Sequence, residues 1–98
     1  IHPDILTSGG ILENKKIGDM AQEYGVAMAV HMAESPIACM AAVHSIAATE
    51  NFLALEFHSV DVPWWSDLVT GLPKPIVDNG YITVPDAPGL GIETWRMR

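Results

Sequence analysis

Three titratable residues, Asp4, His31 and Glu56, each stand at the end of a short apolar run. Each is followed by a loop and then by a helix-like or polar segment. In a parallel α/β sheet or barrel, ligands and catalytic groups gather at the carboxyl ends of the strands. Three strands that each deliver one titratable group to this edge would build an acid–base cluster. We therefore predict that these three residues form the chemical centre of the chain.

The segments that must position these residues alternate between strand and helix. Strands are expected at 1–4, 26–30 and 52–55, and helices at 11–24 and 36–49. Short connections between such elements are typical of right-handed parallel βαβ units. Residues 1–59 are therefore predicted to form one βαβαβ segment.

Apolar spacing predicts which faces of these elements are buried. In the first helix, the stripe at i, i+3, i+4 and i+7 is expected to face the core, and it consists of Ile17, Met20, Ala21 and Tyr24. The run at 26–30 is apolar throughout, which is typical of a strand buried on both faces.

The pattern changes in residues 60–98. One short helix is expected within 60–70. A β-hairpin is expected from strands at 76–77 and 81–84, because Asn79-Gly80 is a strong turn signal. A proline- and glycine-rich connector and an irregular tail should follow.

Composition excludes several classes of protein. The chain has 98 residues, enough for one small domain, and a net charge of −7 with only five basic residues, which are scattered. Nucleic acid and anionic membranes need concentrated positive charge, so neither is expected as a partner. One cysteine allows no internal disulfide, and no apolar run approaches membrane-spanning length, so a cytoplasmic location is expected. The chain starts inside a predicted strand without an initiator Met, which suggests a fragment.

Structural explanations compete with the chemical one. Asp4 could cap its own loop, His31 could be an ordinary strand-end histidine, and Glu56 could be a solvated strand terminus. His58 and Met32 follow two of these residues closely enough to contact a substrate. Two other residues are expected to be structural, namely His44 in the second helix and Cys39 as a small core residue. The Trp64-Trp65 pair could form a lid, although packing is the favoured alternative.

Several motifs together resemble the enolase superfamily, in its mandelate racemase/muconate lactonizing enzyme branch. They are Pro3-Asp4 followed by Gly9-Gly10, Tyr24-Gly25-Val26, His31 placed 27 residues after Asp4, Asn51-Phe52-Leu53 before Glu56, and the segment from Gly80 to Glu93. The likeness is greatest to acid-sugar dehydratases of the galactonate type.

This resemblance implies a fold and a set of roles. The fold would be α/β, the C-terminal portion of a TIM-type barrel that contains strands six to eight. His31 would be the general base or acid at C2 of a carboxylate substrate, and Asp4 would hydrogen-bond to it. Glu56 would lie near the substrate carboxylate and the developing enediolate. The family's Mg²⁺ ligands belong to earlier strands, so this segment is expected to contain no metal ligand.

The implied function is that of a fragment of a magnesium-dependent acid-sugar dehydratase, which removes the proton alpha to a carboxylate. A racemase, epimerase or cycloisomerase of the same superfamily is the alternative. A noncatalytic barrel fragment that only self-assembles is a third hypothesis. Open sheet edges promote association, so the expected partner is a second copy of the chain or the rest of the barrel. The isolated chain should be inactive.

Overall fold

A computed structural model describes residues 1–94, and the final four residues of the expected tail lie outside the described part. The elements are helix α1 (Ile11–Glu23), strand β1 (Met28–Val30), helix α2 (Pro36–Ala47), strand β2 (Phe52–Leu55), the 3-10 helix η1 (Trp65–Leu68), and strands β3 (Val69–Thr70) and β4 (Glu93–Thr94). No helix in the described residues is long and apolar enough to cross a membrane.

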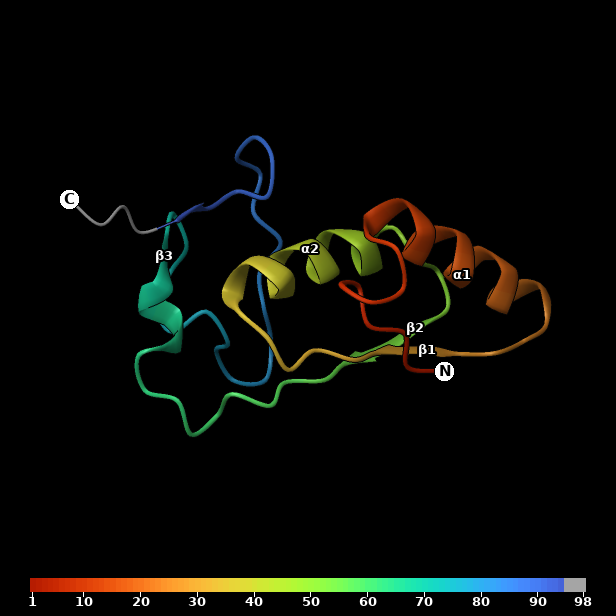
Figure 1. Cartoon of the computed structure of the whole chain (residues 1–98), viewed down its shortest axis with the longest axis horizontal. Coiled ribbons are helices and arrows are strands. Elements are labelled where there is room, and N and C mark those ends of the chain that lie inside the picture. Colours follow the sequence, from red (N-terminus) through yellow and green to blue (C-terminus); the bar gives the residue numbers. More distant parts are fainter. Residues whose placement is uncertain (95–98) are drawn as a thin grey trace.

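The centre of the fold is a parallel arrangement of β1, β2 and the N-terminal segment. β1 pairs with β2 in parallel. On the other edge of β1, the backbone N–H groups of Ala29 and His31 donate to the carbonyls of Ile1 and Pro3 at 2.9 and 3.1 Å. Both helices lie on one side of this layer (Figure 1). The three chain segments therefore run in the same direction, and their carboxyl ends meet at one edge.

The N-terminal segment is less regular than predicted. Residues 1–4 do not form a full strand, and Asp4 makes a single parallel bridge to His31. Proline has no N–H to donate to a ladder, and Pro3 stands immediately before the bridge. The predicted pairing is therefore present without an extended strand.

Helix α1 buries only part of the predicted face: Ala21 is buried and Ile17 is partly buried, as expected, but Met20 and Tyr24 are not. Its buried residues are Asn14, Gly18 and Ala21, whereas Met20 and Tyr24 are 68% and 80% exposed. A Cβ placed on Gly18 would lie 3.0 Å from a side-chain carbon of Thr49. The helix therefore approaches its neighbours along a face of small side chains, which apolar spacing alone does not identify.

Helix α2 contributes to both apolar clusters of the core. Pro36 opens the helix at a position where its missing N–H costs no hydrogen bond. One cluster joins α2 to the C-terminal region through Met40 and Trp65, and the other joins it to β1 through Ala42 and Val30. This helix therefore fixes β1 relative to the rest of the chain.

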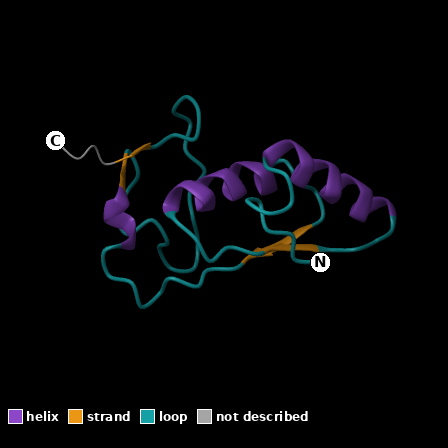
Figure 2. Ribbon diagram, in the orientation of Figure 1, coloured by secondary structure: helices purple, strands orange, loops and turns teal. Residues whose placement is uncertain are grey.

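The C-terminal region differs from the predicted hairpin. Asn79 and Gly80 form the expected turn with positive φ, and one bridge joins Asp78 to Tyr81, but no strands extend from it. Pro75 and Pro85 flank this region and cannot donate to a ladder. The antiparallel pair is instead β3 with β4, which sequence reasoning did not predict (Figure 2). The predicted helix within 60–70 is the single turn η1.

Candidate active site

Asp4 and His31 form a direct side-chain pair at the end of the parallel layer. Oδ2 of Asp4 lies 2.7 Å from Nδ1 of His31. The other carboxylate oxygen, Oδ1, accepts the backbone N–H groups of Leu6 and Thr7 at 2.8 and 3.1 Å. Asp4 therefore caps its own loop and holds the imidazole at the same time, with a different oxygen for each contact.

The electrostatics of this pair favour the charged form of both groups. The hydrogen bond with His31 lowers the pKa of Asp4 and is the largest influence on it. Burial, the second largest, raises this pKa, and the N–H groups of Leu6 and Thr7 lower it further. The hydrogen bond with Asp4 raises the pKa of His31, and the charges of Asp4, Glu56 and Glu34 also raise it. Within the described residues, Nε2 of His31 has no hydrogen-bond partner. The pair therefore fixes Nδ1–H toward Asp4 and leaves Nε2 for another group.

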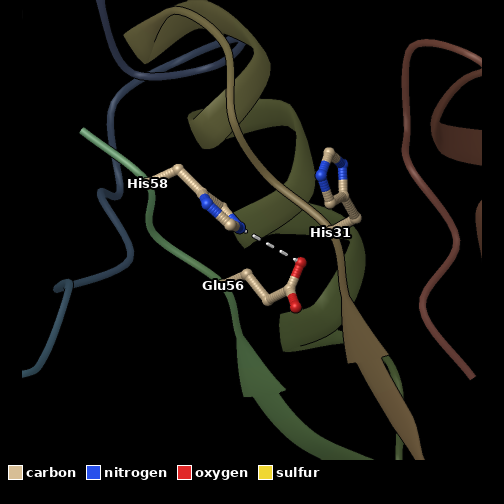
Figure 3. A group of neighbouring side chains, drawn as sticks. All are labelled: His31, Glu56 and His58. Carbon is tan, nitrogen blue, oxygen red and sulfur yellow. Dashed lines mark ion pairs between the residues drawn. The ribbon is translucent and has the colours of Figure 1, made fainter.

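Glu56 reaches the same edge from β2, as Figure 3 shows. It follows the last residue of the strand, and its backbone N–H donates to the carbonyl of Val30 at 3.0 Å. Its carboxylate oxygens lie 3.6 Å from Nε2 of His58 and 3.9 Å from Nδ1 of His2. The ring centroids of His31 and His58 are 5.5 Å apart. One carboxylate thus lies among imidazoles at an edge open to solvent.

The structure brings Asp4, His31, Glu56 and His58 together, as the sequence predicted. Met32 is different, because its side chain is only 1% exposed and belongs to the core. Its contact with substrate stays a prediction that this geometry does not favour. The catalytic roles of the other residues also stay predictions, since geometry shows their positions and not their reactions.

Three further predictions concerned structural residues. Cys39 is fully buried, and burial raises the pKa of its thiol to about 11, which leaves it in the unreactive thiol form. Nε2 of His44 lies 3.0 Å from the Leu90 carbonyl, so this histidine ties α2 to the C-terminal region. Trp65 is buried and donates its indole N–H to the carbonyl of Glu34 at 2.9 Å, whereas Trp64 is exposed and does not pack as predicted. Cys39, His44 and Trp65 each have a packing or hydrogen-bonding role.

Sequence reasoning missed two residues of this edge. Glu34 has a carboxylate grouped with Asp4 and His31, all ligating atoms lying within 4.8 Å of one another. His2 approaches Glu56 from the N-terminal segment. The signal for Glu34 was its place in the loop after His31, at the strand end where functional groups gather.

Comparison with known proteins identifies the family. The sequence matches the family described as "Enolase C-terminal domain-like" over residues 1–96. The chain belongs to this family. It is 42% identical over 92 residues to the D-xylonate dehydratase of Haloferax volcanii, and 35% identical over 97 residues to the D-galactonate dehydratase of Ralstonia nicotianae. These alignments cover 94% and 95% of the chain but 22% and 25% of the two relatives.

Solved structures agree with the sequence relatives. A mandelate racemase/muconate lactonizing enzyme-like protein from Rubrobacter xylanophilus superposes with a TM-score of 0.89 and is 38% identical. The match covers 95% of the chain and 24% of that protein. The chain thus spans about a quarter of the length of its relatives, and its fold is consistent with the C-terminal portion of their barrel.

Proposed function

We propose that this chain is the part of a cytoplasmic, magnesium-dependent acid-sugar dehydratase that supplies one proton-transfer group and its carboxylate partners. The relatives named D-xylonate and D-galactonate dehydratase support the substrate class. The observation that carries the proposal is the Asp4–His31 contact of 2.7 Å at the same edge as Glu56. A positioned imidazole with a raised pKa is suited to general acid–base chemistry.

Each residue has a defined part in the proposed reaction. His31 transfers a proton at C2 of the substrate through Nε2, because Asp4 occupies Nδ1. Loss of the C2 proton sends the bonding electrons toward the carboxylate and forms an enediolate. The enediolate then expels the 3-hydroxyl, which takes a proton from a general acid of the parent enzyme and leaves as water. Glu56 lies beside the substrate carboxylate and the developing enediolate. His58, next to Glu56, contacts the substrate.

The described residues of this chain do not fit Mg²⁺. Mg²⁺ demands near-octahedral coordination, chiefly by oxygen. In residues 1–94, both groups able to surround a cation include imidazole, namely His31 with Glu56 and His58, and His31 with Asp4 and Glu34. The magnesium ligands of the proposed enzyme therefore belong to the remainder of the parent protein.

The test is His31→Asn in the intact parent protein, with the sugar acid in deuterated water. If His31 transfers the C2 proton, the variant loses both C2 exchange and turnover, by about 10²–10⁴-fold or more. His44→Asn is the matched control, because His44 is bonded to the Leu90 carbonyl and lies outside the site. Full exchange in the His31 variant would remove its assigned role. The isolated 98-residue chain should show no turnover with or without Mg²⁺.

A racemase, epimerase or cycloisomerase is the second candidate. It is favoured by the structural likeness to a mandelate racemase/muconate lactonizing enzyme-like protein. Both candidates begin with removal of the proton alpha to the carboxylate. The products separate them: a dehydratase releases a 2-keto-3-deoxy acid, whereas a racemase or epimerase returns an isomer with the same composition.

A further inference from the structure

Two imidazoles and one carboxylate converge at the exposed edge of the fold. The ligating atoms of His31, Glu56 and His58 all lie within 4.8 Å of one another. Figure 3 shows His31 at the end of β1 and the other two side chains on the segment that follows β2. Because β1 and β2 are paired, these segments are held side by side.

The distances approach those of a coordinated metal. Ligand bonds of about 2.0–2.2 Å to a tetrahedral Zn²⁺ place neighbouring ligand atoms roughly 3.3–3.6 Å apart. The carboxylate of Glu56 and Nε2 of His58 are already 3.6 Å apart. Both side chains are partly exposed, and so is His31. Small changes of rotamer can therefore bring the three ligand atoms to coordination distance without disturbing the core.

The Asp4–His31 contact provides an independent observation. A histidine that binds a metal through one ring nitrogen almost always donates the other N–H to a carboxylate or carbonyl, which fixes the tautomer and the ring orientation. Asp4 lies 2.7 Å from Nδ1 of His31, so this arrangement exists before any ion binds. The free Nε2 is the atom left for coordination.

We infer that His31, Glu56 and His58 form a binding site for a borderline transition-metal ion such as Zn²⁺, with Asp4 orienting His31. Two histidines and one glutamate are a ligand set that zinc accepts with a further position open. The site differs in chemistry from a magnesium site, which requires oxygen ligands. If the proposed function holds, the bound ion occupies His31 and Glu56 and therefore inhibits the enzyme. The binding itself does not depend on that function.

Imidazole NMR of the 98-residue chain tests the site, because the chain has four histidines. Single substitutions assign the four ring signals, and ZnCl₂ is then added at neutral pH. We expect the signals of His31 and His58 to shift together and saturate at one equivalent, while that of His44, which is held at the Leu90 carbonyl, stays in place. MgCl₂ at the same concentration should move none of them.

Variants give a second readout by calorimetry with ZnCl₂. His58→Gln should weaken binding by about tenfold or more, and Asp4→Asn by about 10–100-fold, since outer-shell partners typically contribute that much. His44→Gln, a matched change outside the cluster, should bind as the unmodified chain does. Circular dichroism of each variant verifies that the fold is kept. The inference would be overturned if the His44 variant lost as much zinc affinity as the His58 variant, if the His58 variant bound Zn²⁺ as tightly as the unmodified chain, or if the ring signals of all four histidines shifted equally.

Discussion

The Asp4→Asn substitution gives the sharpest test of how the site is built. It keeps the shape of the side chain and removes its charge. Oδ1 of Asp4 accepts N–H groups from Leu6 and Thr7, so the amide oxygen of Asn must take that place. The amide NH₂ then faces Nδ1 of His31, which lay 2.7 Å from a carboxylate oxygen. An NH₂ group cannot accept a hydrogen bond, so Nδ1 must become the acceptor.

The consequence is an inverted tautomer. Neutral His31 carries its proton on Nδ1 in the unmodified chain and should carry it on Nε2 in the variant. The pKa of His31 should fall, because its hydrogen bond with the Asp4 carboxylate is the largest cause of the raised value. In the intact parent protein, Nε2 could no longer accept a proton, and the loss should be about 10²–10⁴-fold in turnover, the usual contribution of general acid–base catalysis.

The tautomer can be measured directly in the 98-residue chain. Long-range ¹H–¹⁵N spectra distinguish the protonated ring nitrogen, and a pH series gives the pKa of His31. Asp86→Asn is the control, because it makes the same charge change at an exposed position of the C-terminal connector. If His31 kept its raised pKa and its Nδ1 proton in the Asp4 variant, the assigned role of Asp4 would be refuted.

Three further predictions concern stability and assembly. The raised pKa of His31 should stabilise the fold fully below pH 6.5, the ordinary pKa of histidine, and this stabilisation should be lost as the pH rises through the pKa of His31 in the folded chain. The lowered pKa of Asp4 should stabilise the fold above pH 3.8, the ordinary pKa of aspartate, and this stabilisation should be lost as the pH falls through the pKa of Asp4 in the folded chain. Urea unfolding at several pH values would detect both. Met40 is fully buried, so Met40→Ala should lower the free energy of unfolding, measured in urea, by about 2–5 kcal/mol. Met20 is exposed, so Met20→Ala should change the free energy of unfolding little. Leu53 is 71% exposed on β2, so Leu53→Lys should weaken self-association in sedimentation; a monomeric unmodified chain would contradict this.

Sequence periodicity was sufficient to predict the order of the elements up to β2. Helices α1 and α2 and strands β1 and β2 lie where local patterns predicted them. Helix ends and apolar runs depend on residues close together in the sequence, so local patterns are sufficient to locate them. The resemblance to the enolase superfamily is confirmed by the family match over residues 1–96, and the fold is consistent with the C-terminal barrel portion that the resemblance implied. The carboxyl-end position of the three titratable residues followed from the same order.

Long-range packing was beyond the reach of local patterns. The buried face of α1 is set by the close approach of Gly18 to Thr49, and a stripe of large apolar residues does not predict this contact. The hairpin prediction was wrong for a related reason. The predicted turn is present at Asn79 and Gly80, but the strands that pair are β3 and β4. These two strands are separated by more than twenty positions in the sequence.

The sequence by itself determined which residue types end the strands, and hence that acid, base and carboxylate would share one edge. Only the tertiary structure decided their contacts. Strand pairing set the register that brings Asp4 to Nδ1 of His31, and the path of the chain after β2 placed His58 against Glu56. These contacts depend on distances of a few ångströms between segments far apart in the chain, which are fixed by the packing of the whole core and not by any local pattern.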